Sequence, residues 1–270
     1  MVAFKLSKLN RALLAEFIAM TLFVFVGCGT AVSSQMSGGG DFQVVTSLAF
    51  GIGIAVLAYT IAPISGGHIN PAVTMAFMLL GKMPYLDGLL YIIVQFFGAI
   101  FGAALLWGCS DSSMYIGDNN TPFNLGANSV NGNLGFASGF LVEGIGTFLL
   151  VWTVMMTAVH KKSIAGNIAP IAIGWSVFLA HSVLIPFTGC GINPARSAGP
   201  HIVNAMAGTP GPRGWWVFYT APFIGAGFAA LTAALLMDLD SEHEEDENAN
   251  AAAGEEEVEK EVPQEKVQTE

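Results

Sequence analysis

Apolar residues in this chain are gathered into long runs that short polar segments separate. A helix that crosses a bilayer needs about 20 predominantly apolar residues, and six runs reach this length. They cover roughly residues 12–34, 43–62, 85–108, 136–159, 165–186 and 215–237. The pattern therefore predicts six membrane-spanning helices.

Two further apolar stretches, 64–81 and 187–206, are too short and too interrupted by Gly and Pro to span. Each holds a Gly-rich loop followed by Asn-Pro-Ala. Asn is favoured as a helix N-cap and Pro at the first helical position, so we expect half-helices at 70–81 and 193–206. A loop at membrane depth is tolerated only where protein buries it or where it lines a watery cavity. The two stretches thus predict a pore with half-helix N-termini aimed at its middle; the residues concerned are Asn70, Pro71, Ala72, Asn193, Pro194 and Ala195.

The two halves of the chain repeat one arrangement. Glu16 precedes Asn70 by 54 residues, and Glu143 precedes Asn193 by 50. Each half has three spans, an odd number, so the second half must enter the membrane in the opposite sense. The predicted fold is an all-α membrane protein of six transmembrane helices and two re-entrant half-helices in an inverted repeat. Its halves are residues 12–108 and 136–237.

Composition agrees with a membrane setting. Of the 270 residues, 53% are hydrophobic and 11% charged, with a mean hydropathy of +0.58, whereas soluble domains carry about 25% charged residues. The net charge of −10 is concentrated at one end, because residues 238–270 hold 14 acids and two lysines. We expect this tail to be disordered, and its partner is not identified by the sequence. The remaining body has a net charge of +2 and no basic surface for nucleic acid.

Basic residues in the loops predict the orientation. With the N-terminus inside, the cytoplasmic side collects six of them, and the opposite side has Arg213 alone. The six are Lys5, Lys8, Arg11, Lys82, Lys161 and Lys162. Residues 1–11 and the tail are then cytoplasmic, and the loop 109–135, which contains the glycosylation sequon Asn119-Asn120-Thr121, is extracellular. Which membrane the chain occupies stays open.

Glu16 and Glu143 lie inside predicted spans, where a carboxylate is costly. They could bind or relay an ion, or they could accept hydrogen bonds from backbone N–H groups of the re-entrant loops. Those loops carry many backbone groups that water cannot reach, and the two acids recur at matching positions. We therefore interpret Glu16 and Glu143 as braces of the loops.

Cysteine spacing predicts neither a disulfide framework nor a zinc site. Cys28, Cys109 and Cys190 are an odd number, lie far apart and form no CxxC pair. We expect no metal and no cofactor.

The paired Asn-Pro-Ala triplets, the continuation of the second as Arg196-Ser197, and the two acids closely resemble the aquaporin (major intrinsic protein) family over about residues 10–237. The resemblance implies homotetramers and a selectivity filter of Phe50, His181, Cys190 and Arg196. This set and Ser197 resemble the water-selective branch, whereas Phe218-Tyr219 departs from its usual aromatic-Trp pair. Cys190 near the pore mouth implies block by mercurial reagents.

Within this resemblance we expect passive conduction of water. Asn70 and Asn193 would hold one water at the midplane, and the positive half-helix ends and Arg196 would repel cations. His181 and Arg196 would donate hydrogen bonds, while Phe50 sets the width. Backbone carbonyls would replace lost hydration; they belong to Gly66, Gly67, His68, Ile69, Gly189, Gly191 and Ile192.

Three alternatives remain open at this stage. A channel of the same family could also pass glycerol, hydrogen peroxide or ammonia. An ion-coupled transporter also uses inverted repeats and broken helices, but it would need its buried acids for coupling. A structural or junctional membrane protein with a closed pore would show negligible water flux.

Overall fold

The computed structural model describes residues 6–36, 41–110 and 124–237. The predicted acidic tail and the sequon at Asn119 lie outside these ranges. Contacts gather the chain up to Ala233 into one compact unit.

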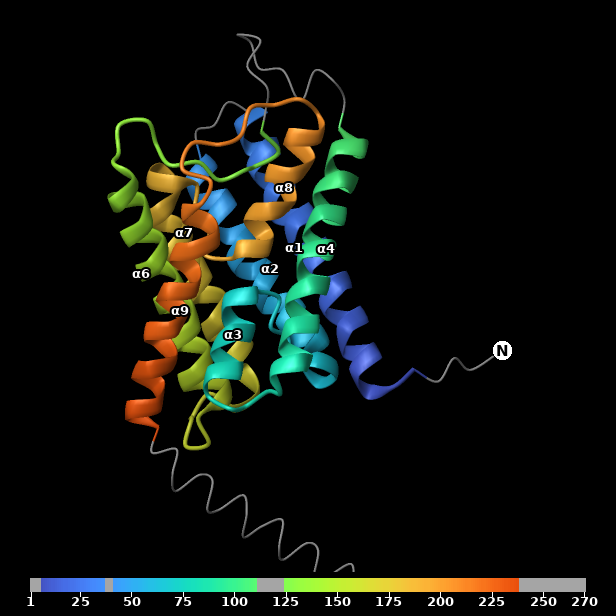
Figure 1. Cartoon of the computed structure of the whole chain (residues 1–270), viewed down its shortest axis with the longest axis vertical. Coiled ribbons are helices and arrows are strands. Elements are labelled where there is room, and N and C mark those ends of the chain that lie inside the picture. Colours follow the sequence, from blue (N-terminus) through green and yellow to red (C-terminus); the bar gives the residue numbers. More distant parts are fainter. Residues whose placement is uncertain (1–5, 37–40, 111–123, 238–270) are drawn as a thin grey trace, which may run out of the picture. The chain divides into compact units, whose positions relative to one another are not determined.

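Within the described ranges the secondary structure is helical, without strands (Figure 1). The helices are α1 (Lys8–Met36), α2 (Phe42–Ser65), α3 (Pro71–Leu79), α4 (Tyr85–Cys109), α6 (Phe136–Val154), α7 (Ala169–Thr188), α8 (Pro194–Met206) and α9 (Val217–Leu236). A π-helical turn, Met155–Val159, extends α6, and a 3-10 turn, Gly166–Ile168, precedes α7. Among these residues six helical segments are long and apolar enough to cross a membrane. The prediction of six spanning helices is confirmed.

The first helix begins at Lys8, four residues before the predicted apolar run. Ser7 causes the early start, because its Oγ accepts a hydrogen bond from the backbone N–H of Asn10 at 3.1 Å and so caps the helix. Hydropathy marks where lipid contact begins, and a cap marks where a helix begins.

The spans that precede the two half-helices end in the same way. Gly66 follows α2 with φ 89°, and Gly189 follows α7 with φ 78°. Both are left-handed C-caps, a conformation that Gly adopts without steric cost. Each turns the chain from a span into the loop that leads to α3 or α8.

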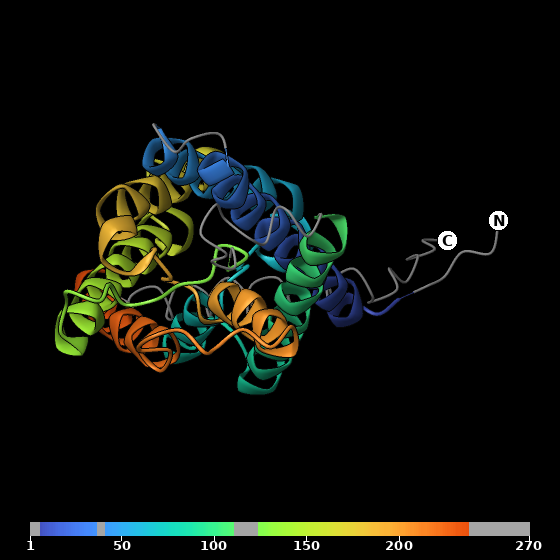
Figure 2. The ribbon, with the colours of Figure 1, turned by 90° about the horizontal axis from the view of Figure 1, so that it is seen from above.

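Small residues let the spans approach closely, and the pairs α1–α4 and α6–α9 lie side by side in Figure 2. A Cβ on Gly98 of α4 would lie 2.6 Å from the carbonyl oxygen of Phe17 in α1. Likewise, a Cβ on Gly174 of α7 would lie 2.5 Å from the carbonyl oxygen of Gly51 in α2. Such contacts are typical of helix packing in membranes.

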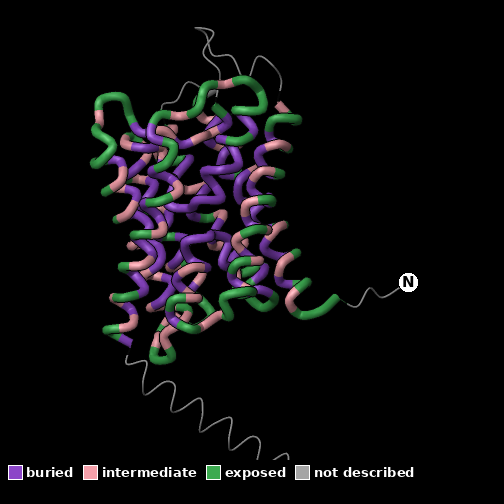
Figure 3. Tube along the Cα trace, in the orientation of Figure 1, coloured by how far each residue is buried: buried purple, intermediate pink, exposed green. Residues whose placement is uncertain are grey.

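Apolar side chains also cover the outside of the bundle. Buried residues lie on the inward faces of the helices and exposed residues on the outward faces (Figure 3). Ile52, Trp175 and Phe228 are each more than half exposed. This surface suits a hydrocarbon solvent, and the interior holds the polar residues described next.

Candidate functional site

The half-helices α3 and α8 both begin with Asn-Pro. Asn70 Oδ1 accepts from the backbone N–H of Ala72 at 2.9 Å, and Asn193 Oδ1 accepts from that of Arg196 at 3.1 Å. Pro71 and Pro194 occupy the first helical turn, where the missing N–H costs nothing. The capping bond fixes each amide plane, so the direction of its NH₂ group is fixed as well.

The free amide groups cross from one half of the chain to the other. Asn70 Nδ2 donates to the carbonyl oxygen of Ile192 at 2.9 Å, and Asn193 Nδ2 donates to that of Ile69 at 2.8 Å. The two half-helix N-termini therefore meet inside the bundle. An amide NH₂ has two hydrogens, so each asparagine keeps one for another acceptor. Sequence reasoning did not predict these cross-bonds, which join residues more than 120 positions apart.

The loops before the asparagines are strained. Ile69, Cys190 and Ile192 have φ of 50°, 57° and 44°. A left-handed conformation costs a residue other than Gly of order 1–3 kcal/mol and persists only where its surroundings enforce it. Ile is a particularly unfavourable residue there because it is β-branched.

Glu16 holds the first loop. Its Oε1 accepts from the backbone N–H of His68 at 2.9 Å and from Ser65 Oγ at 2.8 Å. Its Oε2 accepts from the backbone N–H of Ile69 at 2.7 Å and from Gln95 Nε2 at 2.9 Å. The carboxylate is fully buried, and its four accepted bonds offset the cost of removing it from water.

Glu143 holds the second loop through three hydrogen bonds that match three of those of Glu16. Its Oε1 accepts from Thr188 Oγ1 at 2.5 Å and from the backbone N–H of Gly191 at 2.8 Å. Its Oε2 accepts from the backbone N–H of Ile192 at 2.7 Å. The hydroxyls of Ser65 and Thr188 thus take equivalent places in the two halves.

Three of the four predicted filter residues come together. The rings of Phe50 and His181 stack with centroids 4.5 Å apart, and Arg196 Cζ lies 4.6 Å from the Phe50 centroid. Together with Asn193 they line a cavity of about 10 Å³. This is about the smallest volume that holds one water molecule.

Arg196 is held by the loop that contains Gly126 and Asn128, for which the hydropathy pattern predicts no role. Its Nη1 donates to Asn128 Oδ1 at 2.7 Å and to the carbonyl oxygen of Gly126 at 2.9 Å. Its Nε has no partner among the described residues. Asn128 is fully buried, although it lies in the segment 109–135, which the sequence marks only as a polar connection.

One detail of His181 differs from expectation. Its Nδ1 lies 2.9 Å from the carbonyl oxygen of Val177, which can only accept, so Nδ1 carries the hydrogen. The Nε2 of a neutral ring is then an acceptor, and no described residue binds it. The prediction that His181 donates into the pore is wrong for the neutral ring, because the helix backbone takes its hydrogen.

Cys190 is the fourth predicted filter residue. It is fully buried and is not among the residues that line the constriction. Its backbone N–H donates to Thr188 Oγ1 at 3.2 Å.

A wider cavity of about 360 Å³ continues from the constriction. Three residues, Ile54, Asn70 and Leu150, line both spaces, so an apolar wall faces the asparagine where the two meet. The residues predicted to supply carbonyls are divided: Gly66, Gly67 and His68 line the wider cavity, Gly191 and Ile192 line the constriction, and Ile69 and Gly189 line neither.

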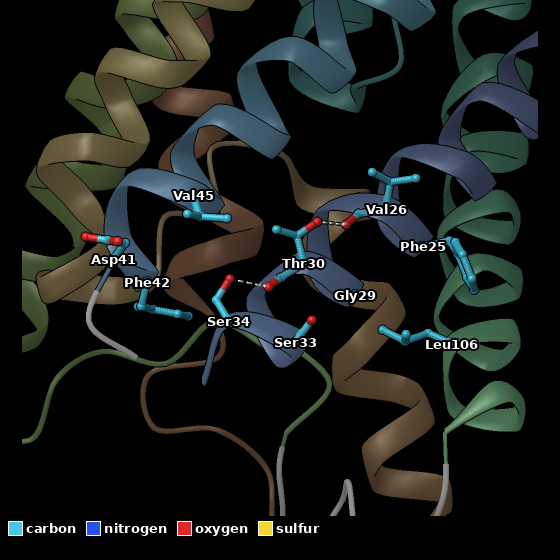
Figure 4. Close-up of a pocket in the computed structure, with 10 residues that line it drawn as sticks. All are labelled: Phe25, Val26, Gly29, Thr30, Ser33, Ser34, Asp41, Phe42, Val45 and Leu106. Atoms are coloured by element: carbon cyan, nitrogen blue, oxygen red, sulfur yellow. Dashed lines mark hydrogen bonds between the residues drawn. The ribbon is translucent and has the colours of Figure 1, made fainter. Parts of the chain in front are cut away.

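A separate hollow of about 700 Å³ lies between the ends of α1 and α2 that adjoin residues 37–40 (Figure 4). It shares no lining residue with the constriction. Thr30 Oγ1 donates to the carbonyl oxygen of Val26 at 2.8 Å, and Ser34 Oγ donates to that of Thr30 at 2.7 Å. These two hydroxyl hydrogens are therefore used within their own helix. In the described residues no group of three or more His, Cys, Asp or Glu could hold a metal ion.

Comparison with known proteins adds four findings. The sequence profile of the family described as Major intrinsic protein matches residues 3–233. Aquaporin-1 of Sus scrofa is 42% identical over 229 residues, which are 82% of this chain and 80% of that protein. Aquaporin-1 of Homo sapiens is 40% identical over 233 residues, 84% of this chain and 82% of that protein. The X-ray structure of the aquaglyceroporin from Plasmodium falciparum aligns with a TM-score of 0.75 at 22% identity, over 86% of this chain and 99% of that one.

Proposed function

Because this chain belongs to the major intrinsic protein family, we propose that it is a passive channel that passes water and excludes protons and other ions. As a member of this family it is a multi-pass integral membrane channel of the aquaporin type and not an enzyme. Its relatives named Aquaporin-1 support water as the substrate. Selectivity for water over other solutes has to follow from the geometry of the site.

The observation that supports selectivity for water is the narrow constriction. The cavity that Phe50, His181 and Arg196 line together with eight other residues has a volume of about 10 Å³, which is room for one water molecule at a time. The unpartnered Nε2 of His181 and Nε of Arg196 offer one acceptor and one donor, the pair that a water molecule needs. Glycerol is larger than this space and would find an aromatic wall in place of further partners.

Exclusion of charge follows from the two half-helices. Each N-terminus carries roughly +0.5 elementary charge, and the cross-bonds bring both to the same depth. Cations that enter meet this positive region after they pass Arg196. The second amide hydrogens of Asn70 and Asn193 would bind the oxygen of a passing water. The hydrogens of that water then point away, and it cannot relay a proton between its neighbours.

The buried acids support a channel over an ion-coupled transporter. Glu16 and Glu143 are occupied by the loops that they hold, which leaves little of either carboxylate for a coupling ion.

We also propose that the protein forms homotetramers, that both termini are cytoplasmic, and that 12–108 and 136–237 are the inverted halves. The basic loop residues support the orientation.

Conduction of small neutral solutes is the second candidate. The aquaglyceroporin neighbour favours it by its name, but at 22% identity that likeness shows the fold alone. The three-residue constriction favours water.

Stopped-flow light scattering on proteoliposomes tests the proposal. The unaltered protein should raise water permeability well above that of empty vesicles and leave glycerol permeability near the background. Arg196→Val and His181→Gly should each admit glycerol, because each enlarges the constriction. Equal glycerol and water permeability of the unaltered protein would refute selectivity. Negligible water flux from correctly folded protein would point to a structural or junctional role.

A further inference from the structure

Two hydrogen-bond acceptors of the loop before α6 hold the Arg196 guanidinium. Of its two hydrogen-bond acceptors, the shorter contact is to the side-chain oxygen of Asn128 at 2.7 Å, and the other is the carbonyl of Gly126. The Phe50 ring beneath it supplies attraction without direction. Whatever orients Asn128 therefore orients the charged wall of the constriction.

Two residues of α8 hold Asn128, one through its side chain and one through its backbone. Ser197 Oγ donates to its side-chain oxygen at 2.8 Å, and His201 Nε2 lies 2.8 Å from its backbone oxygen. Ser197 and His201 are four residues apart and so share one face of the helix. The loop is pinned at this point to the half-helix that carries Arg196.

The hydrogen-bond partners determine the tautomer of His201. A carbonyl oxygen only accepts, so Nε2 carries the hydrogen that binds Asn128. In the neutral ring Nδ1 is then an acceptor, and the Tyr219 hydroxyl lies 3.0 Å from it. The ring is 8% exposed and meets Phe218 edge-on at a centroid distance of 5.8 Å. Tyr219 of α9 donates to His201, and His201 donates to Asn128.

We propose that His201, oriented by Tyr219, is a positioning residue for Arg196 and acts through Asn128. The proposal rests on the proposed function, because it assigns His201 to the selectivity of the same constriction. It gives a role to a buried histidine of α8 and a partly buried tyrosine of α9, neither of which lines the constriction. Loss of the histidine donor frees the Asn128 carbonyl, lets the loop shift and releases the guanidinium from its place over Phe50.

The test is the ratio of glycerol to water permeability in proteoliposomes. We expect His201→Leu to raise this ratio by up to about tenfold, the change that about 1.4 kcal/mol produces. His201→Gln keeps an N–H donor and should restore most of the selectivity. Tyr219→Phe retains the ring and loses only the hydroxyl, so it should shift the ratio less, in the same direction. Met206→Leu, at an exposed position of the same helix, is the matched control.

Arg196→Val separates this inference from the proposed function. If it admits glycerol while His201→Leu and Tyr219→Phe do not, His201 has no positioning role and the inference is overturned. If Arg196→Val also leaves the ratio unchanged, the proposed function fails and the inference fails with it. In the double variant, His201→Leu should add nothing to Arg196→Val, because residues that act through one group are not additive. Independent, multiplying effects would overturn the inference, and Tyr219→Phe keeps the test valid if His201→Leu does not fold.

Discussion

Replacing Glu143 by Gln tests how the second re-entrant loop is held. Glutamine has the same shape as glutamate, but one acceptor oxygen becomes an NH₂ donor. If the remaining oxygen of the glutamine keeps the contacts of Oε1 with Thr188 and Gly191, the NH₂ group takes the place of Oε2. It then faces the backbone N–H of Ile192, which is left without an acceptor. If the glutamine amide is turned the other way, the N–H of Gly191 is left without an acceptor instead.

The cost follows from the hydrogen bonds that are lost. A buried N–H left without a partner costs about 1–3 kcal/mol. In a domain of this size 1 kcal/mol corresponds to about 2–4 °C in Tm, so Glu143→Gln should lower the Tm by about 2–12 °C. Glu143→Leu leaves both N–H groups unpaired and should lower it further. Permeability should fall as well, because the carbonyl of Ile192 is the acceptor for Asn70 and moves with the loop.

Thermal unfolding of the purified protein in detergent, followed by stopped-flow measurement of water flux at equal protein content, provides the assay. Asp41→Asn is the matched control, since Asp41 is exposed and makes no capping bond with its side chain. Glu16→Gln should reproduce the effect in the first half of the chain. If Glu143→Gln matched the unaltered protein in both Tm and water flux, the bracing account would be refuted. Solute accumulation against a gradient that disappears in the variant would restore the transporter alternative.

Two further predictions concern the pore. Asn193→Asp keeps the N-cap oxygen but removes the donor to Ile69 and places a negative charge between the half-helix ends. We therefore expect the cation conductance of vesicles to rise. If the variant excluded cations as well as the unaltered protein does, the electrostatic account would be contradicted. Cys190 does not line the constriction but adjoins Gly191, which does, so mercury bound to its thiol should displace the loop and lower water flux. Cys190→Ser should resist mercurial reagents, and Cys109→Ser, at an exposed position, should stay sensitive. Equal inhibition of Cys190→Ser would place the reactive thiol elsewhere.

Local signals were strong enough to predict the helical framework. Each apolar run is long enough to fill the bilayer, and Asn followed by Pro encodes the start of a half-helix with little help from elsewhere. The bounds were less exact where polar residues decide them, as at Ser7 before α1. The recurrence of Glu16 and Glu143 pointed to a repeat because equivalent loops need equivalent acceptors.

Apart from the loop bracing by Glu16 and Glu143, the contacts between distant segments followed from the tertiary structure alone. Asn128 lies 68 residues before Arg196, and no period or cap in its surroundings indicates that it is buried or what it binds. The cross-bonds of Asn70 and Asn193 likewise depend on how the two halves meet. Hydrophobic length and capping act within a few residues and are readable along the chain. The width of the constriction and the partners of its polar atoms arise from packing between segments and are set only when the chain has folded.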